Sequence, residues 1–90
     1  MSLVKIPTAF RKHTDGDREV DIAQNNVADL LSTLAQKYPD LKTHLYDTDG
    51  SLLSFVNVFV NDTNIRDLDG GATKLNEHDQ VFLVPAMAGG

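Results

Sequence analysis

The 90-residue chain contains no cysteine and no tryptophan, and its hydrophobic residues form no long run. Without a thiol it forms no disulfide bond, holds no thiolate-bound metal and has no cysteine nucleophile. No apolar run approaches the ~18 residues of a membrane-spanning helix. The first residues also lack the basic and then apolar pattern of a signal peptide, so we expect a cytoplasmic protein that is not embedded in a membrane. Any sulfur chemistry in which the protein takes part cannot use a side-chain thiol of its own.

Basic residues are also few. The sequence has 8 Lys and Arg against 13 Asp and Glu, which gives a formal net charge of −5, and the basic residues are scattered rather than clustered. Most of such a surface repels phosphates, so we expect no nucleic-acid partner. The hydrophobic content of 41% and the charged content of 23% are ordinary for a folded chain, and this length suffices for one domain with a compact core.

Apolar periodicity predicts an α+β fold with one main helix. Helical spacing over 27–38 predicts an amphipathic helix with Asn26 as its N-cap, ended by Pro39. Residues 40–51 are mixed and suggest a short helical turn and a loop. The predicted strands cover residues 3–7, 19–22, 52–60, 64–66 and 80–84, with a polar stretch over 11–16 joining the first two.

One helix covers only one face of the predicted sheet, so the other face is solvated or used for binding. Alternation directs the valines of 56–60 towards the helix, together with Val81 and Leu83. It also gathers four apolar side chains on the open face: Phe55, Phe59, Phe82 and Val84. These side chains could shield one another or pack under the 40–51 loop. Alternatively, they form a docking surface for another protein, and an apolar patch on a small acidic protein favours this second interpretation.

The sequence ends in five small or flexible residues, 86–90, that follow Pro85. We expect a folded domain over residues 1–85 and a flexible tail after it. Glycine lacks a Cβ and can pass through a narrow channel, and the carboxylate of a terminal glycine is unhindered for activation. A frayed end that happens to be glycine is the alternative, and the dipeptide alone does not separate the two.

The chain resembles the ubiquitin-like β-grasp fold, which has a mixed four- to five-stranded sheet. The resemblance lies in the β-β-α-β-β order of its predicted elements and in the last strand, which is followed by a proline, a spacer and a Gly-Gly terminus. Within that fold the chain resembles the ThiS/MoaD family of sulfur carriers, most specifically over 55–62 and 79–90. With the long 40–54 connection, it is most similar to the CysO-type carriers of cysteine biosynthesis, and more loosely to the small subunit of molybdopterin synthase. One departure is His78, where family members usually have a glycine; a positive φ there would cost conformational energy.

The resemblance implies a protein carrier rather than an enzyme. It implies that an E1-like enzyme uses ATP to adenylate the carboxylate of Gly90, which a sulfur donor then converts into a thiocarboxylate. It also implies an enzyme that accepts the sulfur. In the cysteine pathway this acceptor is a PLP-dependent synthase, and a metallopeptidase acts after it. The alternative acceptor is the large subunit of molybdopterin synthase. We expect Gly89, Ala88 and Met87 to thread the partner's active site. From strand alternation, we expect Phe59, Phe82, Val84 and Phe55 to form the docking face.

Other functions and sites fit the sequence less well. A thiamin sulfur carrier, a covalent protein modifier and a non-covalent β-grasp binding module are the alternatives. His13 and His44 have no cysteine or carboxylate at ligand spacing, and Asp47-Thr48-Asp49-Gly50 lacks the other positions of a calcium loop. We therefore expect no metal site, no bound cofactor and no catalytic residue, and a monomer when the protein is free.

Overall fold

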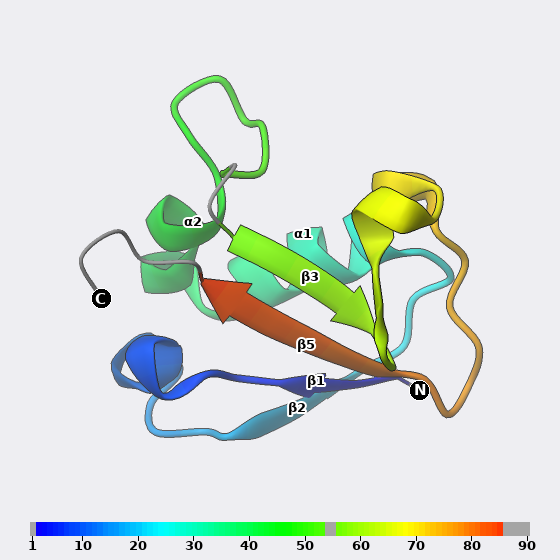
Figure 1. Ribbon diagram of the computed structural model, residues 1–90. Coiled ribbons are helices and arrows are strands. Elements are labelled where there is room, and N and C mark those ends of the chain that lie inside the picture. The colour runs from blue at the N-terminus through cyan, green and yellow to red at the C-terminus, as the bar shows by residue number, and fades with distance from the viewer. Residues whose placement is uncertain (1, 54–55, 86–90) are drawn as a thin grey trace.

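The computed structural model describes residues 2–53 and 56–85. In this part of the chain, five strands form one sheet in the order β2-β1-β5-β3-β4 (Figure 1). β1 and β5 pair in parallel near the centre, and the other neighbours are antiparallel, so the sheet is mixed as predicted. The strands are β1 (Ser2–Lys5), β2 (Glu19–Ile22), β3 (Val56–Val60), β4 (Thr63–Asn64) and β5 (Gln80–Pro85).

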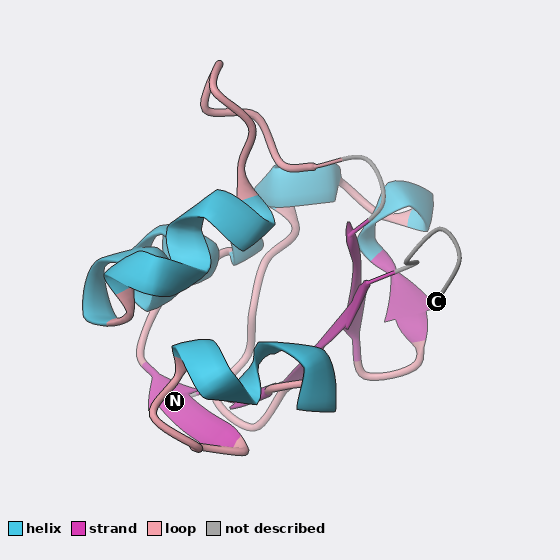
Figure 2. Cartoon of the chain, turned by 90° about the vertical axis from the view of Figure 1, so that its left-hand side faces the viewer, coloured by secondary structure: helices cyan, strands magenta, loops and turns pink. Residues whose placement is uncertain are grey.

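Two α-helices, α1 (Val27–Lys37) and α2 (Pro39–Leu45), lie on one side of the sheet (Figures 1 and 2). Among the described residues, neither helix is long and apolar enough to cross a membrane. The connections also contain three short 3-10 helices: η1 (Thr8–His13), η2 (Ile65–Asp67) and η3 (Gly70–Ala72).

The core lies between the sheet and the two helices, and alternation along each strand selects its residues. Val4 and Val81, which are register partners on β1 and β5, are completely buried. Burying one such side chain contributes roughly 1.5–3 kcal/mol before entropic costs. The other strands contribute in the same way: Val20 and Ile22 from β2, Val56, Val58 and Val60 from β3, and Leu83 from β5.

α1 confirms the prediction for residues 27–38. The Asn26 side-chain oxygen accepts a hydrogen bond from the Asp29 backbone N–H at 2.8 Å, as an N-cap does. The helix buries Val27, Leu30, Leu31 and Leu34 and ends at Lys37, so Tyr38 forms its C-cap. Asp29 in the first turn also interacts favourably with the positive end of the helix dipole.

The prediction of one main helix is incomplete, because α2 follows α1 directly. Pro39 ends α1 but opens α2, where its missing N–H costs nothing and its fixed φ suits a first helical turn. Leu41 and Leu45, one turn apart, are both fully buried. The predicted short turn in 40–51 is therefore a helix of 7 residues that covers the core beside α1.

The connection between β1 and β2 also differs from the predicted polar stretch, since it contains η1. Its Phe10 is buried in the core, and Thr14 beyond it is fully buried as well. β1 ends at Lys5 rather than at residue 7, although the Ile6 N–H still donates to the Arg18 carbonyl at 2.8 Å. The buried side chain of Phe10 thus fixes this connection over the end of the core.

Two further strand predictions need correction. The predicted strand 52–60 is described as β3 only from Val56, since 54–55 lie outside the described residues and Leu52 forms an isolated bridge with Tyr46. The predicted edge strand 64–66 is β4 at 63–64, followed by η2, because the Asn64 side chain accepts from the Arg66 N–H at 2.9 Å and turns the chain.

The turn before β5 forms where predicted, and the Asp79 N–H donates to the Asn76 carbonyl at 3.2 Å. His78 does not adopt positive φ, so its difference from glycine carries no backbone strain there. The left-handed residue of this corner is Asn61, with φ 55, and its side chain accepts from the Gln80 N–H at 3.1 Å. Asparagine tolerates this conformation better than most residues.

We predict that Leu41→Ala destabilises the protein by about 2–5 kcal/mol, since it removes buried methyl groups and leaves a cavity under α2. The exposed neighbour Lys42→Ala is the control and should change the stability by less than about 0.5 kcal/mol. Urea unfolding followed by circular dichroism measures both. Equal stabilities of the two variants would show that α2 does not hold the core.

Candidate functional site

The face of the sheet opposite the helices carries the predicted apolar patch. Phe59 on β3 and Phe82 on β5 are register partners, and both side chains are half-buried. Val84 follows on the same face and is 44% exposed, opposite Asn57. The alternation that predicted these three positions is confirmed, and we call Phe59, Phe82 and Val84 the docking face. Phe55, predicted to join them, lies outside the described residues.

The docking face is not covered by residues 40–51, one of the two alternatives for its apolar side chains. That segment instead packs on the core through Leu41, Leu45 and Tyr46. The two phenylalanines lie side by side as register partners on antiparallel strands, and both are half-buried. Val84, however, remains largely accessible to a partner.

β5 ends at the same end of the molecule as η1 and α2 (Figure 1). Its last residue, Pro85, pairs with Val56 of β3. Residues 86–90 lie outside the described residues, and with them the predicted reactive residue Gly90 and the predicted threading residues Gly89, Ala88 and Met87. The docking face therefore adjoins the point from which the chain continues towards these residues.

The fold also gathers basic residues that are spaced apart in the sequence. Lys5, Arg11 and Arg18 line one pocket of about 350 Å³ together with Ile6 and Glu19, and we call it the basic pocket. Lys5 forms an ion pair with Glu19, its register partner on β2. The Arg11 Nε donates to the Ile6 carbonyl at 3.2 Å. Sequence reasoning missed this pocket because its residues come from β1, η1 and the start of β2.

The segment that carries Arg18 is fixed to α1 by Tyr38. The Tyr38 hydroxyl donates a hydrogen bond of 2.6 Å to the Asp17 carboxylate, and the Tyr38 side chain is only 7% exposed. Burial is the main cause that raises the pKa of Tyr38 from 10.0 to about 12, with further contributions from the Asp17 hydrogen bond and the charges of Asp17 and Asp15. Tyr38 is thus a neutral donor at physiological pH.

Two histidines from η1 and α2 stack at the same end. The rings of His13 and His44 are 4.0 Å apart at 25°, and Phe10 lies 6.0 Å from His44. Burial lowers the pKa of His44, and the nearby charges of His13 and Lys12 lower it further, while Asp40 acts in the opposite direction. Within residues 2–53 and 56–85, no group of three or more His, Cys, Asp or Glu side chains is placed to hold a metal ion.

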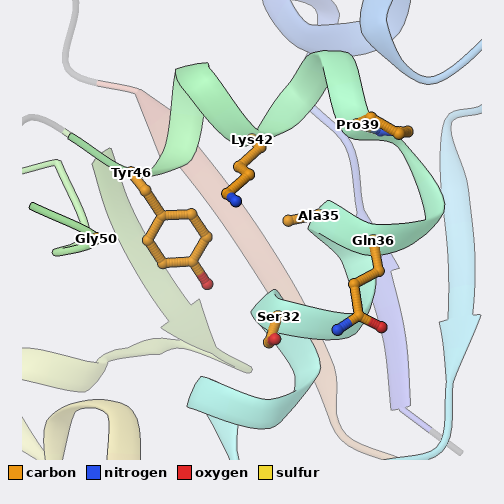
Figure 3. Close-up of a pocket in the computed structure, with 7 residues that line it drawn as sticks. All are labelled: Ser32, Ala35, Gln36, Pro39, Lys42, Tyr46 and Gly50. Carbon is orange, nitrogen blue, oxygen red and sulfur yellow. The ribbon is translucent and has the colours of Figure 1, made fainter. Parts of the chain in front are cut away.

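A separate pocket of about 550 Å³ lies between α1 and α2 (Figure 3). Lys42 and Tyr46 extend into it from α2 and its C-cap, and Ser32 lines it from α1. Burial raises the pKa of Tyr46, so its hydroxyl is also neutral at physiological pH. This pocket is on the helical side of the molecule, away from the docking face and the basic pocket.

A mixed five-stranded sheet with helices on one face defines a ubiquitin-like β-grasp protein, and the other face of this sheet carries an exposed apolar patch. The ThiS family model matches residues 4–90, and the chain therefore belongs to the ThiS family.

Curated and solved relatives agree with this assignment. The chain is 37% identical to the sulfur carrier protein CysO of Mycobacterium tuberculosis over 89 residues, which cover 97% of this chain and 96% of CysO. It is similar to a structure of the Amycolatopsis orientalis BexX/CysO complex, with a TM-score of 0.89 and 30% identity over the full length of both chains. It is also similar to small archaeal modifier protein 1 of Methanosarcina acetivorans, with a TM-score of 0.86 and 30% identity over 99% of this chain and 95% of that one.

These findings confirm the predicted β-grasp fold and the predicted general function, that of a ubiquitin-like sulfur carrier. The roles of individual residues are a separate matter. The docking face is where alternation predicted it, and its role in binding stays a prediction.

Because the folded-state pKa of Tyr38 is raised, its contribution to stability is fully present below pH 10 and is lost as the pH rises towards about 12. We predict that the free energy of unfolding of the wild type falls more steeply over this range than that of Tyr38→Phe, which has no ionisable group at position 38. Urea unfolding in steps from about pH 8 upwards measures both slopes. Equal slopes of the free energy of unfolding against pH would show that burial does not raise the pKa of Tyr38.

Proposed function

We propose that Gly90 is the reactive residue of this chain and carries sulfur as a C-terminal thiocarboxylate. An E1-like partner enzyme would activate the Gly90 carboxylate with ATP, forming an acyl-adenylate and releasing pyrophosphate. A sulfur donor would then add sulfide at the acyl carbon, and AMP would leave with the electron pair of the broken C–O bond. Activation is needed because a carboxylate is a poor electrophile, whereas the mixed anhydride has a good leaving group.

One observation carries this proposal: the family match extends from residue 4 to residue 90, and the identity to CysO covers 97% of the chain. The likeness therefore includes the Gly-Gly terminus on which the proposed chemistry depends. The absence of cysteine from all 90 residues agrees with it, because a neighbouring thiol could intercept an activated acyl group as a thioester.

The scaffold would contribute binding rather than chemistry. Phe59, Phe82 and Val84 would seat on the partner, while Met87, Ala88 and Gly89 would pass through a narrow channel to its active site. The BexX/CysO complex of A. orientalis supports the idea that a chain of this family binds a separate protein. Each partner would then act on the same terminus in turn.

Cysteine biosynthesis is the pathway that we propose, because a relative that is similar over almost the full length of the chain is a CysO protein. The thiocarboxylate would attack an aminoacrylate held on a PLP-dependent synthase, and a metallopeptidase would release the product from the carrier. The large subunit of molybdopterin synthase and the thiamin pathway are the other acceptors. The cytoplasm, where such biosynthesis takes place, stays the predicted location.

We predict that incubation of the full chain with its adenylating enzyme, ATP and sulfide replaces one oxygen by sulfur. Intact-mass spectrometry detects the exchange, and a thiol-reactive alkylating agent should then label this cysteine-free protein once. Deletion of Gly90 should abolish both signals, whereas Lys74→Ala, a change at an exposed side chain away from β5, should keep them. A mass shift that persists without Gly90 would refute the assignment.

The docking face gives a second prediction with a matched control. Val84 on the docking face and Leu68 next to η2 are equally exposed at 44%, so an aspartate at either position has similar access to water. Val84→Asp should lower the rate of thiocarboxylate formation at least about tenfold, as loss of an apolar interface contact does, and Leu68→Asp should not. Equal rates would place the partner elsewhere on the molecule.

A covalent modifier is the second candidate function, favoured by the similarity to small archaeal modifier protein 1. Up to the adenylate the two functions share every step; they differ in whether lysine or sulfide attacks it. Immunoblots of cells that express an N-terminally tagged chain separate them. A ladder of large conjugates that disappears when Gly90 is deleted indicates modification, and a single small band indicates sulfur carriage.

A further inference from the structure

We propose that the basic pocket, lined by Lys5, Arg11 and Arg18, is a second contact site for the adenylating enzyme and receives an acidic segment of that enzyme. This inference rests on the proposed function, because it assigns part of the surface by which the carrier would recognise its partner. The docking face would supply apolar contact area, and the basic pocket would fix the orientation in which the carrier binds.

The charges in the pocket are only partly compensated. Lys5 is paired with Glu19, which is the only carboxylate among the lining residues. Arg11 uses its Nε for the Ile6 carbonyl, and among the described residues the exposed Arg18 side chain has neither an ion pair nor a hydrogen bond. The pocket therefore offers two guanidinium groups, which match carboxylates in a bidentate geometry.

The backbone at the two arginines is fixed by hydrogen bonds within the chain. The Arg18 carbonyl accepts from Ile6, and the Arg11 carbonyl accepts from the Thr14 and Gly16 N–H groups at 3.1 and 2.8 Å. The buried Thr14 hydroxyl donates to the Asp17 carbonyl at 2.9 Å. Because Asp17 also accepts from Tyr38, its carboxylate is engaged towards α1 and does not line the pocket. Because the backbone is already fixed, the entropy cost of binding falls mainly on the side chains.

The distribution of charge along the chain singles out this end of the molecule. Half of the eight basic residues fall within residues 5–18, although the whole chain has a net charge of −5. These four are opposed by two acidic residues, Asp15 and Asp17, whereas residues 61–79 at the opposite end hold five acidic residues against two basic ones, Arg66 and Lys74. A partner with an acidic segment is thus attracted to one end and repelled from the other, and this orients the encounter.

The position of the pocket suits a partner that binds the docking face, and the adenylating enzyme is the first such partner in the proposed function. Lys5 is the register partner of Phe82, so the pocket and the docking face are contiguous across β1 and β5. Both adjoin the end of the sheet at which β5 stops. An enzyme that binds both the docking face and the chain terminus would also cover the pocket. Its surface at that point would have to be acidic for the contact to be favourable.

The first test uses hexaglutamate as a probe for the acidic segment. In ¹⁵N-¹H spectra of the full-length chain, hexaglutamate should cause saturable shifts at the amides of Lys5, Arg11 and Arg18, and inorganic phosphate should bind at least about fivefold more weakly. Arg18→Glu should weaken hexaglutamate binding about tenfold, whereas Lys74→Glu, which changes the net charge equally, should weaken it less than about twofold. Shifts located elsewhere, or phosphate binding as tight as that of the peptide, overturn the proposal.

The second test uses the adenylating enzyme of the same organism. Arg18→Glu should weaken its binding to the carrier about tenfold at low ionic strength, with the difference from Lys74→Glu vanishing above about 0.5 M NaCl. Unchanged dispersion in the ¹⁵N-¹H spectra confirms that each variant is folded. Equal affinities of the two variants overturn the assignment to this enzyme. Failure of the proposed function itself is seen separately, as a wild-type chain that binds but never gains sulfur.

Discussion

The parallel pairing of β1 with β5 is the constraint on which the structure depends. It joins the first and last strands at the centre of the sheet, where Val4 and Val81 lie side by side and are completely buried. The pairing starts with the Leu3 N–H, which donates to the Asp79 carbonyl at 3.0 Å. Parallel strands need a long crossover, and here everything from η1 to η3 lies in it, including the two helices that cover the core.

The placement of the binding surfaces follows from this pairing. Because β5 lies between β1 and β3, its outward side chains meet Phe59 on one side and Lys5 on the other. The docking face and the basic pocket are therefore neighbours, although their residues span most of the chain. Both lie next to the end of β5, after which the family match continues to residue 90. A rigid sheet thus presents its contacts in a fixed relation to the start of the C-terminal segment.

Much of this could be predicted from local sequence. Alternation correctly assigned the faces of β2, β3 and β5, and Asn26 marked the start of α1 because capping is a local interaction. α2 was predicted only as a short helical turn, because Pro39 is read as a helix stop and the burial of Leu41 and Leu45 under the same core is not a local signal. The strand order and the basic pocket depend on the parallel pairing, which no local pattern encodes; the fold was expected from family resemblance instead.

The central proposal is that the scaffold performs no chemistry and that the reactive group is the terminal carboxylate. The most direct measurement is to fragment the sulfur-loaded protein in a mass spectrometer and locate the sulfur atom. The account predicts sulfur only in fragments that contain the carboxyl group of Gly90. Sulfur on any fragment that lacks Gly90, or a protein that stays free of sulfur while its adenylate forms, would contradict it.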